Sequence, residues 1–299
     1  TIQISTTGGG IGTWAPPVVT PFVNGKRMAA GGVAVSNTGN IVWASTGDAR
    51  AIRTTLDGGN TWQTPVFRAT EGGANIDVSE AYWHGDFTRR REFLWAEKSI
   101  AGCFYIYVDS YTPGGGAAQP APFAGLYRST DGGLTFIRVH TGDFHSDTIS
   151  GAPEMKVRPV PGQASNHIFV IRGQIGSYGD GPVAGGVKFL NLSTGQLTTL
   201  PGWSSPDDVA FGKGKPGSSY LRVLIKGWRG GVMGYYYSDD FDPANPTAAT
   251  WSLWTRFPMG RADDGCVLLG DPDRHGLFWV ATQGGGFQVL ARDFGMLLS

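Results

Sequence analysis

Carboxylates are the residues of this sequence whose spacing can serve general acid–base chemistry. An enzyme that cleaves a glycosidic bond with inversion needs two carboxyl groups about 6.5 to 9.5 Å apart, so that one protonates the leaving oxygen while the other activates water. Glu80 is the best single candidate because it stands beside three ring-bearing residues in the stretch NIDVSEAYWH, and Asp77 is its nearest companion. We predict Glu80 and Asp77 as the catalytic carboxylates, if the chain is catalytic.

Two further acidic pairs, Asp207–Asp208 in SSPDDVAFG and Asp263–Asp264 in GRADDG, are less suited to this role. Neighbouring side chains on a strand point to opposite faces, so neither pair forms an acid and base couple by itself. We interpret both pairs as residues that cap turns or lie in solvated loops.

Aromatic residues supply the second kind of chemistry, because their faces stack on the apolar faces of sugar rings while nearby polar groups bind the hydroxyls. The candidates near loops or strand ends are Trp83, Trp203, Trp228, Tyr236 and Trp254. Burial in the core is the alternative for each of them. Strand alternation sends Tyr236 to the face opposite Tyr235 and Tyr237, and we expect at least one of the three to be exposed.

An eight-residue pattern occurs twice, as TLDGGNTW from Thr55 and as STDGGLTF from Ser129. Both copies read Ser/Thr-x-Asp-x-Gly-x-Thr-aromatic, which is the Asp-box, and each lies between two strand-like runs. We expect Asp57 and Asp131 to accept backbone hydrogen bonds within a hairpin turn, a structural role rather than a catalytic or calcium-binding one. Two degraded copies are predicted, one from Ser5 to Trp14 without the aspartate and one from Ser238 to Trp251 with an insertion.

These repeats belong to a chain rich in residues that interrupt regular backbone, with 47 Gly and 18 Pro among 299 residues. Short strand-like runs recur between the glycines, among them GGVAVS, IVWAS, CFYIYVD, HIFVIRG, VKFLNL, YLRVLIKG, MGYYYS, CVLLGD and LFWVATQ. Repeated units that are each built from several such short strands are typical of propeller blades. We predict an all-β fold, a single β-propeller over residues 1–299 with about five to seven blades. The first blade begins in its middle and is completed by residues 275–290 or by another chain.

Composition excludes several classes of partner. The formal net charge is zero and charged residues make up 16% of the chain, so no basic field attracts nucleic acid. No apolar run has the length of a membrane helix. No Cys, His, Asp and Glu set has metal-ligand spacing, and we predict no metal and no cofactor. The two cysteines, Cys103 and Cys266, form either one bridge or two buried thiols. The N-terminal residues do not read as a leader, so either none exists or one has been removed.

Several segments resemble the xyloglucan-cleaving glycoside hydrolases of family 74, enzymes with two propellers. The distinctive matches are FGKGKPGSSY from Phe211 and GDPDRHG from Gly270, since neither belongs to the generic Asp-box. With the matching segments between Gly31 and Phe287 they resemble only the later part of that family. The stretches that carry the base and the acid in the family are both missing here, and no catalytic residue is carried over.

The resemblance leaves two functions open. The chain is either part of a two-propeller hydrolase that inverts β-1,4-glucan linkages, or a non-catalytic propeller that binds glycans or other partners on a cell or virus surface. Xyloglucan or a related neutral β-glucan, and a second propeller, are the partners it implies, and the location is extracellular or surface-exposed. A sialidase is a weaker alternative, because the early Phe/Tyr-Arg-Ile-Pro segment of those enzymes is missing.

Overall fold

The computed structural model divides into two compact units, and its described residues form strands and one short 3-10 helix. One unit comprises Thr1–Asp147 with Pro161–Ser165, and the other comprises Thr148–Val160 with Asn166–Ser299. The structure describes residues 3–5, 13–17, 19, 21–23, 26–28, 31–45, 51–78, 93–108, 122–141, 153–162, 166–174, 186–256, 267–282 and 286–291.

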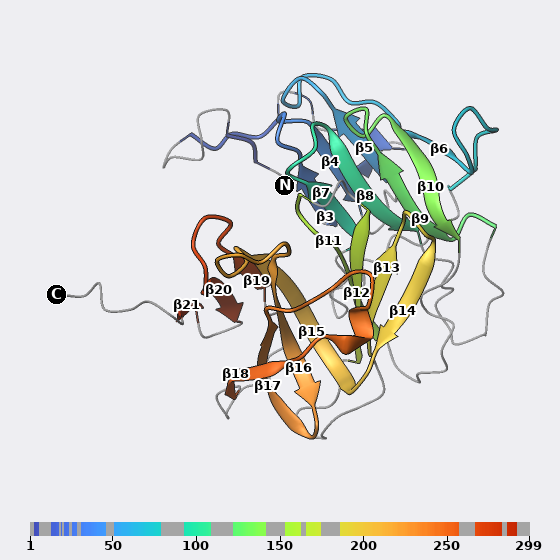
Figure 1. Cartoon of the computed structure of the whole chain (residues 1–299). Helices are drawn as coiled ribbons and strands as arrows, with labels where there is room; N and C mark the ends of the chain where they lie inside the picture. The colour runs from blue at the N-terminus through green and yellow to red at the C-terminus, as the bar shows by residue number, and fades with distance from the viewer. Residues whose placement is uncertain are drawn as a thin grey trace. The chain divides into compact units, whose positions relative to one another are not determined.

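The first unit contains two blade-like sheets and a short ribbon (Figure 1). One sheet has the order β3-β4-β5 and the other β6-β10-β9-β8-β7, in which β6 is parallel to β10 and every other pair is antiparallel. The ribbon pairs β1 with β2. The strands are β1 (Phe22–Val23), β2 (Lys26–Arg27), β3 (Gly32–Val35), β4 (Ile41–Ser45), β5 (Ala51–Thr55), β6 (Val66–Arg68), β7 (Leu94–Glu97), β8 (Cys103–Val108), β9 (Gly125–Ser129) and β10 (Thr135–Thr141).

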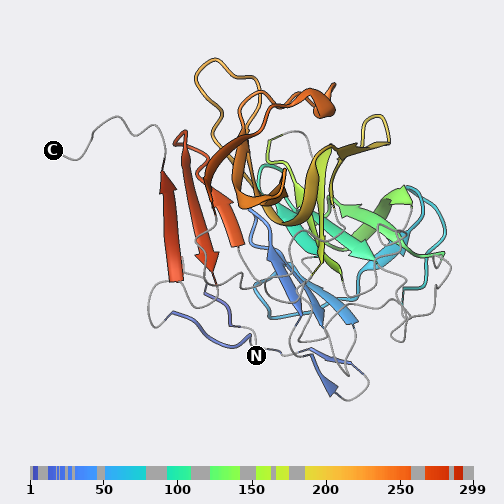
Figure 2. The same cartoon turned by 90° about the horizontal axis from the view of Figure 1, so that it is seen from below.

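The second unit contains three antiparallel sheets, each of which follows the order of the chain (Figure 2). They are β11-β12-β13-β14, β15-β16-β17-β18 and β19-β20-β21. The elements are β11 (Pro153–Pro159), β12 (His167–Gln174), β13 (Gly186–Asn191), β14 (Gln196–Leu200), β15 (Trp203–Gly212), β16 (Arg222–Arg229), β17 (Val232–Ser238), η2 (Pro246–Ala248), β18 (Ser252–Arg256), β19 (Val267–Gly270), β20 (Leu277–Thr282) and β21 (Gly286–Ala291).

The strands β15, β16 and β17 are buried on both faces, because their alternate residues enter two different cores. Val223 and Ile225 of β16 pack in one core with residues of β12 and β13, whereas Leu224 packs in the other with Phe278 of β20. A strand buried on both faces reads as a continuous apolar run, as the segment YLRVLIKG, which leads into β16, does here. The cores thus hold successive blades of this unit face to face.

The prediction of an all-β propeller is confirmed by five blade-like sheets among the described residues. Every strand-like run named from the sequence coincides with a strand. The prediction did not include β1, β2, β11, β14, β15 and β18 as strands. In β15 the apolar pattern is broken by Ser205, Pro206, Asp207 and Asp208, and tertiary pairing with β16 overrides it.

The repeated Asp turns share one hydrogen-bond pattern. Thr55 donates its hydroxyl to Asp57 Oδ1 over 2.7 Å, and Asp57 accepts the backbone N–H and the hydroxyl of Thr61 at 2.9 and 2.6 Å. Asp131 accepts the Ser129 hydroxyl at 2.7 Å and the N–H of Thr135 at 2.9 Å. Each aspartate therefore links the hydroxyl residue on the first side of the turn to the threonine on the returning side.

The two degraded copies adopt related geometry. Asp240 accepts the Ser238 hydroxyl at 2.8 Å and the Thr250 N–H at 3.0 Å, although the insertion separates them. Where the aspartate is missing, the hydroxyls of Ser5 and Thr13 lie 2.8 Å apart and bind each other directly. In all four turns the residue before the first hydroxyl pairs with the residue after the aromatic position, as Ile4↔Ala15, Thr54↔Gln63, Arg128↔Ile137 and Tyr237↔Ser252.

The second glycine of a turn is where the preceding sheet approaches most closely. Gly133 has φ +92°, and a Cβ on it would lie 2.4 Å from Val42 Cγ2 of β4. Its carbonyl accepts a hydrogen bond from the Thr54 hydroxyl of β5 at 2.7 Å. The turn needs glycine for its backbone conformation and for the space that the neighbouring sheet occupies.

Candidate functional site

The carboxylates favoured from the sequence lie at the edge of the described chain. Asp77 is exposed and follows the isolated bridge between Arg68 and Asn75, and Glu80 lies outside the described residues. Trp83 lies outside them as well. Glu80 and Asp77 therefore stay predictions.

The aromatic candidates of the second unit fall into two groups. Trp203 is 7% exposed and Tyr236 is 6% exposed, and their rings meet edge to face at 5.5 Å inside the core that includes Val223. Trp228 and Trp254 are partly exposed. The rings that offer surface to a ligand are therefore Trp228 and Trp254, whereas those of Trp203 and Tyr236 pack against protein.

The tyrosine run of β17 alternates as expected. Tyr236 enters one core, and Tyr235 enters the other with Tyr237 packed against it. The expectation that one of the three is exposed was wrong, because Tyr235 is 1% exposed and Tyr237 is half-buried. Both faces of β17 are covered by protein, so the alternate tyrosine side chains enter one core or the other instead of solvent.

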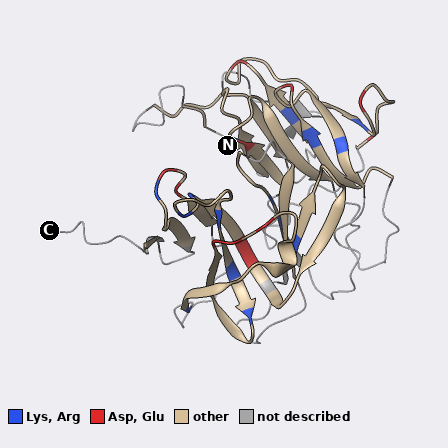
Figure 3. Ribbon diagram, in the orientation of Figure 1, with Lys and Arg blue, Asp and Glu red and all other residues tan. Residues whose placement is uncertain are grey.

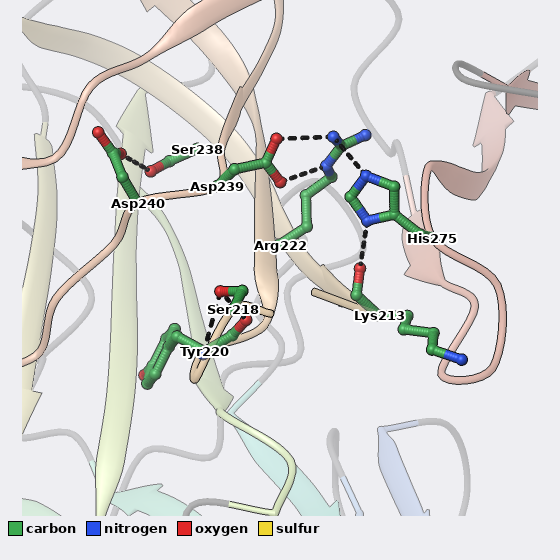
Figure 4. Close-up of polar contacts among 8 residues, drawn as sticks. All are labelled: Lys213, Ser218, Tyr220, Arg222, Ser238, Asp239, Asp240 and His275. Carbon is green, nitrogen blue, oxygen red and sulfur yellow. Dashed lines mark hydrogen bonds and ion pairs between the residues drawn. The ribbon is translucent and has the colours of Figure 1, made fainter. Parts of the chain in front are cut away.

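Trp254 and Tyr237 flank a buried arginine. The Arg222 guanidinium lies 4.6 Å from the centre of the Tyr237 ring and 5.6 Å from that of Trp254. Arg222 donates two hydrogen bonds to Asp239, at 2.6 Å from Nε and 2.7 Å from Nη2 (Figure 4). The fork of the guanidinium matches both carboxylate oxygens and fixes the arginine in the plane of the pair.

The same arginine reaches His275 from the turn before β20. Arg222 Nη2 lies 2.9 Å from His275 Nε2, and His275 Nδ1 lies 3.1 Å from the carbonyl oxygen of Lys213 (Figure 4). A guanidinium can only donate and a carbonyl can only accept. His275 Nε2 therefore accepts from Arg222, and Nδ1 carries the proton that it donates to Lys213.

These contacts bring together the two segments that resemble family 74. Asp271 accepts the N–H groups of Asp273 and Arg274 at 2.8 and 2.9 Å, and its own carbonyl accepts the N–H of Lys213. A Cβ on Gly270 would lie 2.1 Å from the carbonyl oxygen of Phe211. The distinctive residues of both segments thus close a corner between two sheets, which is a structural role.

The acidic pair of β15 is not in a loop, and that interpretation of Asp207 and Asp208 was wrong. Asp208 is completely buried and forms ion pairs with Arg158 Nη2 at 3.0 Å and Lys156 Nζ at 3.2 Å, both from β11. It also accepts the backbone N–H groups of Val209 and Leu268. Asp207 pairs with Lys226 Nζ at 2.5 Å and keeps 27% of its side chain exposed.

Cation partners of this kind left no signal in the sequence, because Arg158 and Asp208 are 50 residues apart. A buried carboxylate in a continuous strand needs such partners, since an unpaired charge in a protein interior is costly. The run PDDVAF indicates only the buried carboxylate, because two charges enter a strand that is otherwise apolar.

The carboxylates of the Asp turns are poor proton donors. The Thr61 hydroxyl, Thr61 N–H and Thr55 hydroxyl lower the pKa of Asp57 to about 2. Burial acts to raise the pKa of Asp131 and of Asp240, yet the hydrogen bonds from the Ser and Thr residues of each turn lower it below its usual value. A general acid in glycoside hydrolysis needs a raised pKa. These three aspartates are therefore suited to holding turns.

Within the described part of the chain, no group of three or more His, Cys, Asp or Glu side chains is arranged to hold a metal ion. No described helix is long and apolar enough to cross a membrane. Cys103 is buried in β8, and Cys266 lies outside the described residues, so the bridge between them is not tested.

Comparison with known proteins relates the chain to xyloglucanases. It is 25% identical over 256 residues to the xyloglucanase Xgh74A of Acetivibrio thermocellus, which covers 80% of this chain and 27% of that protein. No family model matches the chain. The sequence resemblance to family 74 glycoside hydrolases is confirmed, and the chain spans about a quarter of the length of the curated relatives it matches.

Two solved structures share the fold. A GH74 enzyme of Niastella koreensis superimposes with a TM-score of 0.61 and 21% identity, over 95% of this chain and 33% of that one. The GH74 xyloglucanase of Xanthomonas campestris gives a TM-score of 0.55 and 19% identity, over 94% of this chain and 32% of that one. The likeness establishes a common β fold with one third of each enzyme.

Proposed function

We propose that this chain is a glycan-directed propeller that supplies one wall of a binding cleft for xyloglucan or a related neutral β-glucan. The observation that carries the proposal is the similarity to a xyloglucanase along 80% of the chain. The Phe211–Tyr220 and Gly270–Gly276 segments support it, because they build one corner here and are not features of the repeated turns.

The physical character of the chain suits an uncharged polymer. Its formal net charge is zero, and the partly exposed Trp228 and Trp254 offer ring faces that can stack on pyranose rings. Trp203 and Tyr236 are buried in the core that includes Val223 and offer no ring face to a ligand. We propose in addition that the four related turns are Asp-boxes, with Asp57 and Asp131 as their structural aspartates.

Binding without catalysis by this chain alone is the second candidate. The adjacent carboxylates Asp207 and Asp208 are both neutralised by cations, and the pKa values of Asp57, Asp131 and Asp240 are lowered. If the chain takes part in inversion, the acid and the base are Asp77 and Glu80, or they are supplied by a second propeller. We propose a second propeller as partner and a secreted or surface location.

We further propose that the N-terminal hairpin, in which Ile4 pairs with Ala15, is the outer part of a blade. Its turn has the pairing of the other three turns, each of which joins outer strands of a sheet.

Affinity electrophoresis in gels that contain tamarind xyloglucan tests the proposed binding. We expect the native chain to be retarded in xyloglucan and not in pullulan, an α-linked glucan of the same neutral charge. Equal mobility in both gels would overturn the proposal. A reducing-end assay on the same protein separates the two candidates, since turnover by the chain alone requires a complete acid and base pair.

A further inference from the structure

A three-residue bulge interrupts β15 opposite a single residue of β16. Ser204 pairs with Trp228 and Asp208 pairs with Lys226, so Ser205, Pro206 and Asp207 stand opposite Gly227 alone. A Cβ on Gly227 would lie 2.8 Å from Pro206 Cα. The bulge therefore requires glycine on the partner strand, and bulges of this kind commonly re-aim a side chain at a functional position.

The side chain that this bulge carries is Asp207. Its carboxylate accepts from Lys226 Nζ at 2.5 Å, and the lysine is 1% exposed while the carboxylate keeps 27% of its surface open. The next residue, Asp208, is held in place by its buried ion pairs with Arg158 and Lys156. Asp207 is thus a partly exposed carboxylate whose position is fixed by Lys226 and by its buried neighbour Asp208. It is a well-oriented hydrogen-bond acceptor. Figure 3 shows the acidic and basic positions side by side in this sheet.

An aromatic ring lies on the same face of the sheet. Trp228 follows Lys226 by two residues on β16, and side chains two apart on a strand share a face. Trp228 is partly exposed, and its strand partners are Ser204 and Met233. Trp228 therefore lies on the face of β16 that carries Lys226, the cation partner of the Asp207 carboxylate, at the end of β15 and β16 where the bulge stands.

We propose that Asp207 and Trp228 form a subsite for one pyranose ring of a neutral glycan. The indole covers the apolar face of the ring, and the two carboxylate oxygens accept hydrogen bonds from adjacent sugar hydroxyls. Lys226 holds the carboxylate in position and does not contact the sugar. The subsite rests on the proposed function, because it names residues that bind the glycan.

Calorimetric titration with oligosaccharides from tamarind xyloglucan tests the subsite. We expect Asp207→Asn and Trp228→Ala each to raise the Kd by about tenfold or more, since a hydrogen bond to a charged group or a lost ring contact has that effect. Asp273→Asn and Trp14→Ala, at exposed positions, are the matched controls and should change the Kd by less than about twofold.

Asp207→Asn also removes the charge partner of a buried lysine, so its unfolding midpoint is measured beside its Kd. Trp228→Ala leaves that ion pair intact and decides the question if Asp207→Asn does not fold. Native binding with unchanged Kd in Trp228→Ala would overturn the subsite and leave the proposed function standing. A native chain that binds no xyloglucan oligosaccharide would overturn both.

Discussion

Asp208→Asn is the perturbation whose magnitude follows most directly from the structure. The substitution keeps the shape of the side chain and removes one negative charge that is completely buried. Arg158 and Lys156, which are 2% and 4% exposed, then lose the carboxylate that neutralises them. Removing one partner from a buried ion pair typically costs about 3–5 kcal/mol.

We therefore expect the free energy of unfolding of Asp208→Asn to fall by about 3–5 kcal/mol. Urea unfolding followed by tryptophan fluorescence measures this change, because Trp203, the first residue of β15, is buried in the core. Asp273→Asn is the control, since Asp273 is exposed, and its change should stay below about 0.5 kcal/mol. A loss below about 1 kcal/mol in Asp208→Asn would refute the structural role of the network.

Three further predictions concern the turns and the corner. Gly133→Ala forces φ +92° and a contact of 2.4 Å with Val42, and should lower the urea midpoint much more than Gly195→Ala, whose φ is +70° with open space around it. The pKa of Asp57 is lowered from 3.8 to about 2, so its ionised form stabilises the fold above about pH 4. This contribution to the free energy of unfolding is lost as the pH falls from about 4 to about 2. In an acid titration, Asp57→Asn should therefore lack the loss of stability that the native chain shows in this pH range. Arg222→Lys loses the bidentate pair and should lower the melting temperature, with no change expected if the guanidinium fork is unimportant.

The fold was largely predictable because its signals are local. Strands such as Ile41–Ser45 and Cys103–Val108 are apolar runs between glycines, and the Asp turns have fixed spacing. The insertion in the fourth turn did not hide it, since Ser238, Asp240 and Thr250 retain their types. The parallel pairing of β6 with β10 was not predictable, because it joins segments far apart in the chain.

The candidate site was less predictable, since burial and long-range pairing decide it. Trp203 and Trp228 have the same local appearance, yet the first is a core residue and the second is partly exposed. Asp208 belongs to a buried ion network whose cations come from β11. Arg222 and His275 meet only because two turns close the same corner.

Direct titration of the native chain with xyloglucan oligosaccharides tests the central claim, that this propeller binds a neutral β-glucan. We predict saturable binding heat that does not decrease at high salt, because both ligand and chain lack net charge. Absence of binding heat, or binding only to charged polysaccharides with strong salt dependence, would contradict it.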